Sequence, residues 1–285
     1  MAKSTAFVLS GGGSLGSIQV GMLQALAIRG IAPDFLIGTS VGALNAAFIA
    51  GHGATEDAVD ALAETWLGLD RGDVFPLDPT RLALATFGRA SSICSNGPLE
   101  RIIRANLTFE RLEDAPIPLH VVTTDVSSGK EVLLSRGDAA TAVLASSAIP
   151  AIFPPVELGG AVLMDGGIAD NAAISQAIDL GAEIIYVLPT GYACALDKPP
   201  RSPLSAAVHA LTLLIEQRLI VDVERYCGKV DIRVAPPLCP LEVSSIDFGH
   251  TGRLIEESRS ATARWLTFDD RPREHPGSVL SLHKH

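Results

Sequence analysis

The first fifty residues contain two strand–turn–helix units in succession, and this order constrains the fold more than any other feature of the chain. A short apolar run at residues 5–9 leads into the glycine cluster of residues 11–13, and an apolar helical stripe follows as far as Gly30. A second apolar run at residues 35–37 leads into another glycine-containing turn and an apolar helix over residues 41–50. Strands and helices that alternate in this way pair in parallel through right-handed crossovers. We therefore predict an α/β fold, a three-layer sandwich with a mainly parallel central sheet.

The composition indicates one domain with a large core. Of the 285 residues, 47% are hydrophobic and 19% are charged. Residues 56–113 combine helical and irregular character and are interpreted as an insertion over the sheet. We expect a single domain over residues 5–268, with its motifs in a core of about residues 6–180, and a flexible polar tail over residues 269–285.

The charge of the chain excludes one class of partner. A formal net charge of −10 without a basic run argues against a nucleic-acid partner. Contact with a membrane surface would have to use apolar side chains rather than positive charge. No stretch reaches the roughly 18 apolar residues of a spanning helix, so we expect a cytoplasmic protein that contacts membranes peripherally. The cysteines lack metal-binding spacing, so we expect no metal and only reduced thiols at Cys94, Cys194, Cys227 and Cys239.

Ser40 lies in a Gly-x-Ser-x-Gly pattern, and the elements predicted on either side of the pattern favour a functional role. The pattern spans Gly38 to Gly42, after a predicted strand and before an apolar helix. A serine at such a sharp turn is held in a strained backbone with its hydroxyl exposed, as a nucleophile requires. The glycines allow the helix to cross close to the strand. A tight turn with a capping serine is the alternative, and the strand–turn–helix context favours the nucleophile.

The glycine cluster before the first helix is the second candidate site. Gly11, Gly12 and Gly13 leave several backbone N–H groups free to converge on an anion, as an oxyanion hole for ester hydrolysis requires. Gly11, Gly13 and Gly16 also satisfy a dinucleotide-binding fingerprint. That alternative requires an acidic residue at the end of the second strand, whereas Asp34 precedes the strand. We therefore expect no cofactor.

Asp165, Gly166 and Gly167 form the third candidate. They follow a predicted hairpin, with a Gly-Gly turn at residues 159–160, that would present the carboxylate from a rigid edge. The glycines permit a close approach to a neighbour. An ordinary Asp-Gly turn is the alternative.

Taken in order, these three motifs resemble the patatin-like phospholipases. Residues 145–150, Ala-Ser-Ser-Ala-Ile-Pro, and the pair Asp170-Asn171 are also similar to segments of that family. The resemblance implies a Ser-Asp dyad of Ser40 and Asp165, oxyanion donors at residues 11–13, no cofactor, and hydrolysis of fatty-acyl esters of lipids. It implies a lipid or small-ester substrate. Leu15 stands where the family usually has a basic residue, which puts a strictly phospholipid substrate in question.

Two alternatives to this interpretation remain open at this stage. Ser40, Asp165 and His250 occur in the chain order of a Ser-Asp-His triad. The fold could also serve as a non-catalytic lipid- or protein-binding module. A further hypothesis concerns the insertion, where large apolar residues would line an acyl channel or meet a lipid surface: Trp66, Phe75, Leu82, Leu84 and Phe87.

Overall fold

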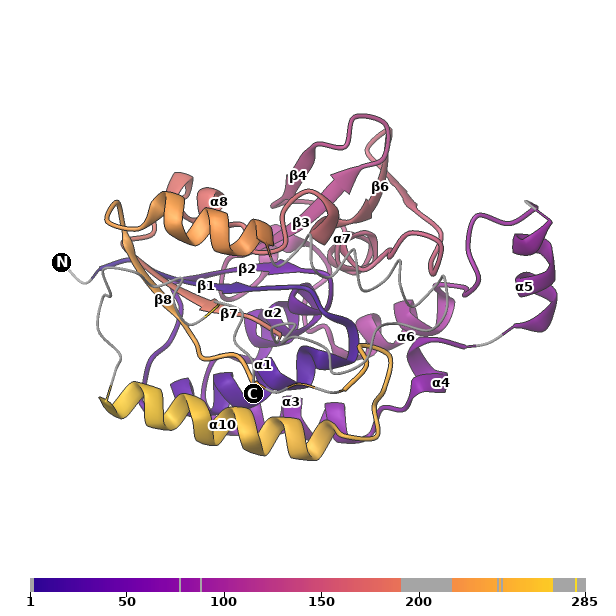
Figure 1. Ribbon diagram of the computed structural model, residues 1–285. Helices are drawn as coiled ribbons and strands as arrows, with labels where there is room; N and C mark the ends of the chain where they lie inside the picture. The colour runs from indigo at the N-terminus through magenta and orange to yellow at the C-terminus, as the bar shows by residue number, and fades with distance from the viewer. Residues whose placement is uncertain are drawn as a thin grey trace.

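An eight-stranded sheet forms the centre of the protein, as a computed structural model shows (Figure 1). The structure describes residues 3–76, 78–87, 89–190, 217–239, 241, 243–268 and 280. The strands are β1 (Thr5–Leu9), β2 (Phe35–Thr39), β3 (Leu119–Asp125), β4 (Glu131–Leu134), β5 (Val156–Leu158), β6 (Ala161–Asp165), β7 (Ile184–Leu188) and β8 (Asp231–Val234). They lie in the order β5-β6-β3-β2-β1-β7-β8, and β4 pairs with β3 outside this path.

The sheet is parallel through its centre and antiparallel at one side. β3, β2, β1, β7 and β8 pair in parallel, whereas β4, β5 and β6 join through antiparallel pairs. Gly159 and Gly160 turn the β5–β6 hairpin with φ of 60° and 85°. Such values suit a two-residue primed turn, so the predicted hairpin is confirmed.

Helices cover both faces of the sheet. They are α1 (Gly16–Ile28), α2 (Val41–His52), α3 (Glu56–Leu67), α4 (Arg71–Val74), α5 (Pro79–Thr86), α6 (Gly97–Asn106), α7 (Ala139–Ser146), α8 (Ile174–Asp179) and α10 (Thr251–Phe268), with residues 217–226 also helical. Among the described residues, short 3₁₀ turns lie at Gly13–Leu15, Leu112–Asp114 and Gly166–Ile168.

The core is divided by the sheet into two apolar layers, because successive strand residues point to opposite faces. Phe7 and Leu9 of β1 join the larger layer with α1, α2, α3, α7 and α10. Ala6 and Val8 join the smaller layer with α8 and the helix at 217–226. Figure 1 shows α8 and α10 on opposite sides of the sheet. The predicted three-layer α/β sandwich with a mainly parallel sheet is confirmed.

Some expectations fall outside the described residues or are wrong. An apolar stripe over residues 204–226 predicts a long amphipathic helix, which the structure describes only from residue 217 onward, where residues 217–226 are helical. The tail at 269–285 lies outside the described residues except for Leu280, which is fully buried against the smaller apolar layer. Cys239 takes part in a disulfide, so the expectation of reduced thiols is wrong for this residue.

Candidate functional site

Ser40 occupies the sharp turn between β2 and α2 in a backbone conformation that few non-glycine residues adopt. Its φ of 54° and ψ of −124° indicate local strain, which is typical of functional sites. The flanking glycines are required by space. A Cβ on Gly38 would lie 2.5 Å from the Ala43 Cα, and one on Gly42 would lie 2.2 Å from the Leu9 carbonyl oxygen.

Ser146, at the end of α7, fixes the backbone of the Ser40 turn. The Ser40 amide donates to Ser146 Oγ at 2.8 Å, and Ser146 Oγ donates to the Val122 carbonyl of β3 at 2.6 Å. All three residues are buried. Sequence reasoning included Ser146 only as part of a family-like segment and missed this role, because the contact joins residues 106 positions apart.

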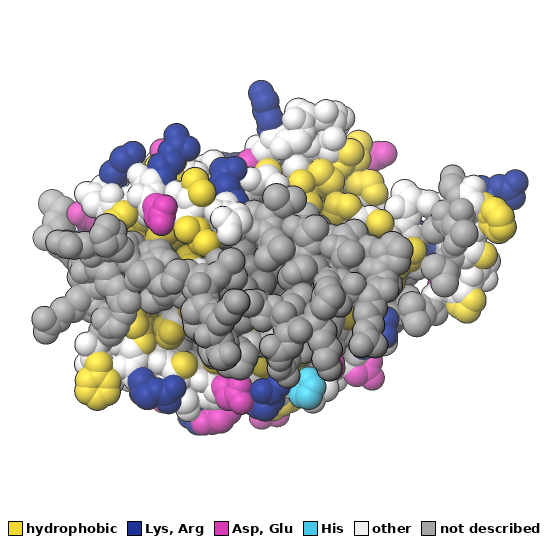
Figure 2. Space-filling model, in the orientation of Figure 1, with side chains coloured by type: hydrophobic (Ala, Val, Ile, Leu, Met, Phe, Trp, Pro, Cys, Tyr) yellow, Lys and Arg dark blue, Asp and Glu magenta, His cyan; other side chains and the backbone are white. Residues whose placement is uncertain are grey.

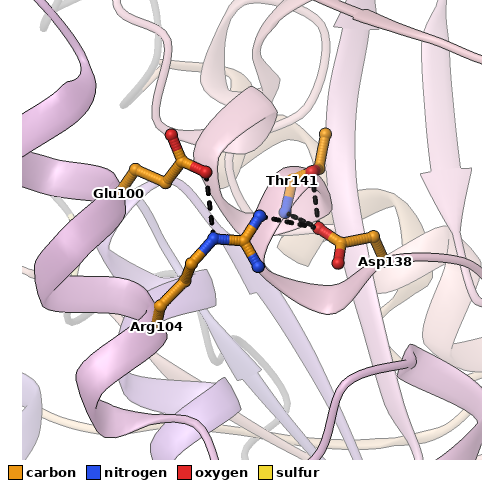
Figure 3. A network of polar contacts seen from close by, with 4 residues as sticks. All are labelled: Glu100, Arg104, Asp138 and Thr141. Atoms are coloured by element: carbon orange, nitrogen blue, oxygen red, sulfur yellow. Dashed lines mark hydrogen bonds and ion pairs between the residues drawn. The ribbon is translucent and has the colours of Figure 1, made fainter.

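The start of α7 is held in turn by a polar network at the protein surface (Figure 3). Asp138 caps the helix by accepting the Thr141 amide at 2.7 Å. Arg104 of α6 bonds both Glu100, at 2.9 Å, and Asp138, at 3.4 Å. Because these ion pairs are about half exposed, the helix cap supplies most of the stabilisation, about 1 kcal/mol.

Asp165 is the side chain that the fold brings to Ser40. Ser40 Oγ donates to Asp165 Oδ2 at 2.6 Å, and the Gly167 amide donates to Asp165 Oδ1 at 2.9 Å. The two side chains lie together because of the strand order. β2 ends just before Ser40, β6 ends at Asp165, and both strands pair with β3, which lies between them. A Cβ on Gly166 would lie 2.3 Å from the Val122 carbonyl, so glycine is required for this approach.

The Asp165 carboxyl is a stronger base than an ordinary aspartate. Burial raises its pKa to about 6, and the hydrogen bonds from Ser40 and Gly167 only partly offset this effect. Desolvation disfavours the charged form of a carboxyl group, so the bound proton is held more tightly. A carboxylate with this pKa is able to accept the Ser40 proton near neutral pH.

The glycine loop lies directly beside Ser40. A Cβ on Gly11 would lie 2.9 Å from Ser40 Cβ, and one on Gly16 would lie 2.4 Å from Val41 Cγ2. Gly12 is the N-cap and Gly13 the first residue of a 3₁₀ turn, positions whose amides have no partner within the turn itself. The Gly11 amide instead donates to Asn171 Oδ1 at 2.8 Å.

A pocket with apolar walls opens next to Ser40 and Gly13. Aromatic rings form part of its wall, and Phe75 stacks on Phe153 with 5.5 Å between ring centroids. Trp66, also in the wall, donates through Nε1 to Asn45 Oδ1 at 2.8 Å, so these polar groups are already paired. The space next to Ser40 is therefore suited to a hydrocarbon chain.

Two of the large apolar residues of the insertion lie in the wall of this pocket. Trp66 and Phe75 line the pocket, whereas Phe87 does not line it and is 79% exposed. Phe87 follows α5, which stands apart from the body of the protein in Figure 1. We call α5 and Phe87 the α5 lobe, and Figure 2 shows hydrophobic side chains on it. The structure says nothing of the Leu82 side chain.

Within the described residues, no histidine is hydrogen-bonded to the Ser40 hydroxyl. His250 is about half exposed and its Nε2 lies 3.6 Å from Asp247 Oδ2. His120 pairs with Ser135 at 2.7 Å, and His52 contacts the Phe48 carbonyl at 2.9 Å. His209 lies outside the described residues.

The residues that the structure describes include no group of three or more His, Cys, Asp or Glu side chains placed to hold a metal ion. Nor does any described helix combine the length and apolar character needed to cross a membrane.

A second buried carboxyl group was missed by sequence reasoning. Asp170 is 1% exposed, and its Oδ2 atom has no hydrogen-bond partner among the described residues. Burial, together with the nearby carboxylates of Glu131 and Asp222, raises the pKa of Asp170 to about 7. Sequence patterns gave no indication of this cluster, because its members come from three distant segments.

Asp170→Asn is expected to stabilise the fold at alkaline pH. A pKa above the unfolded value of about 3.9 means that stability is lost as pH rises from about 4 through about 7. Asparagine keeps the acceptor for the Ala172 amide and removes the charge. We expect the free energy of unfolding to rise by on the order of 1–3 kcal/mol at pH 8 and to change little at pH 4. Urea unfolding at both pH values tests this, and an equal change at both would contradict it.

Comparison with known proteins gives the site a family context. A family model described as "Patatin-like phospholipase" matches residues 7–178. An uncharacterized NTE family protein of Mycobacterium tuberculosis is 32% identical over 187 residues, which cover 65% of this chain and 30% of that protein. Lysophospholipase NTE1 of Pyricularia oryzae is 28% identical over 196 residues, 66% of this chain and 12% of that protein. The chain therefore spans less than a third of the length of either relative.

The solved structures that match this chain are more distant from it in sequence than these relatives. VipD from Legionella pneumophila is 17% identical, with a TM-score of 0.48 and coverage of 93% of this chain and 67% of that one. Human GIVD cytosolic phospholipase A2 is 12% identical, with a TM-score of 0.49 and coverage of 93% and 58%.

Proposed function

Because the chain belongs to the patatin-like phospholipase family, we propose that it hydrolyses fatty-acyl ester bonds of lipids, with Ser40 as nucleophile and Asp165 as general base. The observation that carries the proposal is the 2.6 Å bond from Ser40 Oγ to Asp165 Oδ2 beside an apolar pocket. A buried carboxylate that accepts a hydrogen bond from a strained-turn serine is the arrangement that nucleophilic catalysis requires.

The reaction proceeds in two halves. Ser40 Oγ attacks the ester carbonyl carbon while its proton passes to Asp165 Oδ2, and the carbonyl oxygen becomes an oxyanion. The amides of Gly12 and Gly13 stabilise that oxyanion, because the Gly11 amide is already bonded to Asn171. The bond between the acyl carbon and the alcohol oxygen then breaks, and the alcohol leaves with the proton from Asp165. Asp165 next takes a proton from a water molecule, whose oxygen attacks the acyl carbon and forms a second oxyanion. When the bond from the acyl carbon to Ser40 Oγ breaks, Asp165 returns the proton to Ser40 Oγ and the fatty acid leaves.

The pocket indicates which part of the substrate is recognised. Its apolar walls suit a hydrocarbon chain, and we propose that the charged or polar head group stays outside. The substrate class is therefore a lysophospholipid, phospholipid or acylglycerol. The Pyricularia oryzae relative, which is named a lysophospholipase, supports the first of these. A screen of these three lipids alongside p-nitrophenyl esters from acetate to palmitate tests the proposal, and a preference for acetate would contradict an acyl-chain pocket.

The pH dependence of acylation should follow Asp165. Since burial raises the pKa of Asp165 to about 6, kcat/KM for a short ester should fall below that pH as the base becomes protonated. We expect one acid limb near pH 6 in the wild type and an unchanged limb in His250→Ala. A limb that disappears in His250→Ala, with the fold intact, would instead support the triad.

We also propose that the α5 lobe contacts the lipid surface. Leu84 and Phe87 are 40% and 79% exposed there, and apolar side chains of this kind insert into the membrane interface. Phe87→Gln should lower activity on long-chain lipid in vesicles several-fold and leave activity on soluble butyrate esters unchanged. Equal losses on both substrates would reduce the lobe to a folding role. Peripheral membrane contact and a cytoplasmic location remain predictions.

A further inference from the structure

Gly11 is held from both sides by side chains that are distant in the sequence. Its amide donates to Asn171 Oδ1 at 2.8 Å, and its carbonyl accepts from Thr190 Oγ1 at 2.7 Å. Thr190 also donates its amide to Ser10 Oγ at 3.1 Å. Because both peptide groups around Gly11 are fixed, the start of the glycine loop has little freedom to move relative to β1.

The contact with Asn171 sets the distance between this loop and the nucleophile. A Cβ added to Gly11 would lie 2.8 Å from Asn171 Oδ1 and 2.9 Å from Ser40 Cβ. The Gly11 backbone therefore fits closely between the Asn171 side chain and Ser40. Loss of the Asn171 oxygen would leave the part-buried Gly11 amide without its acceptor and remove one wall of this narrow space.

Asn171 belongs to the same short segment as the proposed base. The chain leaves Asp165, forms the 3₁₀ turn Gly166–Ile168, and closes that turn with a bond from the Asp170 amide to the Gly166 carbonyl at 2.9 Å. Thr39, which precedes the nucleophile, contacts the Asp170 carbonyl at 3.4 Å. One segment thus carries the base at one end and the acceptor for the glycine loop at the other.

We propose that Asn171 is a positioning residue, whose side-chain oxygen holds the glycine loop at the distance from Ser40 and Asp165 that oxyanion stabilisation requires. The inference deepens the proposed hydrolase function and depends on it. It also assigns the Gly11 amide a structural role and leaves the oxyanion to the amides of Gly12 and Gly13.

The residue type matters as well as the bond. An amide oxygen accepts the Gly11 hydrogen without adding charge. An aspartate at this position would accept the same hydrogen but would place a negative charge near both the oxyanion and the Asp165 carboxylate. This added negative charge would disfavour ionisation of Asp165 and so raise the pKa of Asp165.

The test compares Asn171→Ala, Asn171→Asp and a matched control at the other end of β1. In the control, Asp34→Ala, the lost side chain likewise accepts a backbone amide, that of Thr5 at 2.7 Å, but it lies away from Ser40. The measurements are kcat, KM and the pH profile on p-nitrophenyl butyrate, with Tm recorded for each variant.

We expect Asn171→Ala to lower kcat by about 10–100-fold with little change in KM, since small misplacements of catalytic groups lower the rate by factors of that order. Asp34→Ala should lower Tm and keep kcat within about twofold, because it removes one hydrogen bond outside the site.

Asn171→Asp keeps the inference testable if the alanine variant does not fold. It should lower kcat and move the acid limb upward, by at least about half a pH unit. An Asn171→Ala variant with wild-type kcat, or an Asn171→Asp variant with an unmoved limb, would overturn the inference. Ser40→Ala separates the two claims: if it is inactive while Asn171→Ala is fully active, only the positioning role fails, whereas an active Ser40→Ala refutes the hydrolase mechanism itself.

Discussion

Asp165→Asn is expected to lower kcat by about 10⁴-fold, because removal of one member of a catalytic unit of this kind has effects of that size. Asparagine has the same shape and can still accept the Gly167 amide, so the loop should keep its course. It cannot take the Ser40 proton. Single-turnover and steady-state kinetics on p-nitrophenyl butyrate, with circular dichroism to confirm folding, measure the effect.

Ser40→Ala provides the companion measurement. It should be at least as inactive as Asp165→Asn, and the double variant should be no worse than the more severe single one, since the two residues act as one unit. Losses that multiply would show that Ser40 and Asp165 act separately. Retention of most activity by a well-folded Asp165→Asn would remove Asp165 as the base.

The glycine loop gives the second large effect. Gly13→Ala should lower kcat by about 10²–10³-fold, the usual cost of losing an oxyanion donor. Gly13 has a φ of 62°, and an added Cβ would lie 2.3 Å from the Ser245 carbonyl oxygen. The loop must therefore move, and its amides move with it.

Gly30→Ala is the matched control for this change. Gly30 has nearly the same φ, 66°, but nothing lies within 4 Å of an added Cβ. Both variants carry the same left-handed strain, of about 1–2 kcal/mol. Gly30→Ala should therefore lose stability without losing kcat, and a similar loss of kcat in both variants would contradict the oxyanion role.

The sequence predicted the parts of the molecule that depend on local pattern. The apolar runs at residues 5–9 and 35–37 and the glycine turns after them have short-range physical causes, so the parallel strands and the Ser40 turn were predictable. The Gly159-Gly160 hairpin was predictable for the same reason. Asp165 and Gly11–Gly13 were placed as candidates by their motifs, and the structure brings both next to Ser40.

Ser146 and Asn171 entered the sequence analysis only as parts of family-like segments, and the roles that it missed act across the fold. Ser146 supports Ser40, and Asn171 contacts Gly11 through a bond that spans 160 positions. Neither the residue types nor their spacing in the sequence predicts such a contact. The raised pKa of Asp170 likewise depends on Glu131 and Asp222, which only the tertiary structure brings near. The position of Phe87 outside the pocket could not be predicted either, because the sequence does not distinguish an exposed phenylalanine from a buried one.

Covalent labelling with a long-chain alkyl fluorophosphonate, followed by mass spectrometry of the peptides, tests the Ser40–Asp165 mechanism most directly. Such probes react only with a serine that a neighbouring base activates. The mechanism predicts stoichiometric labelling of Ser40 in the wild type and in His250→Ala, and no labelling in Asp165→Asn. Labelling of a different serine, or undiminished labelling of Ser40 in Asp165→Asn, would contradict it.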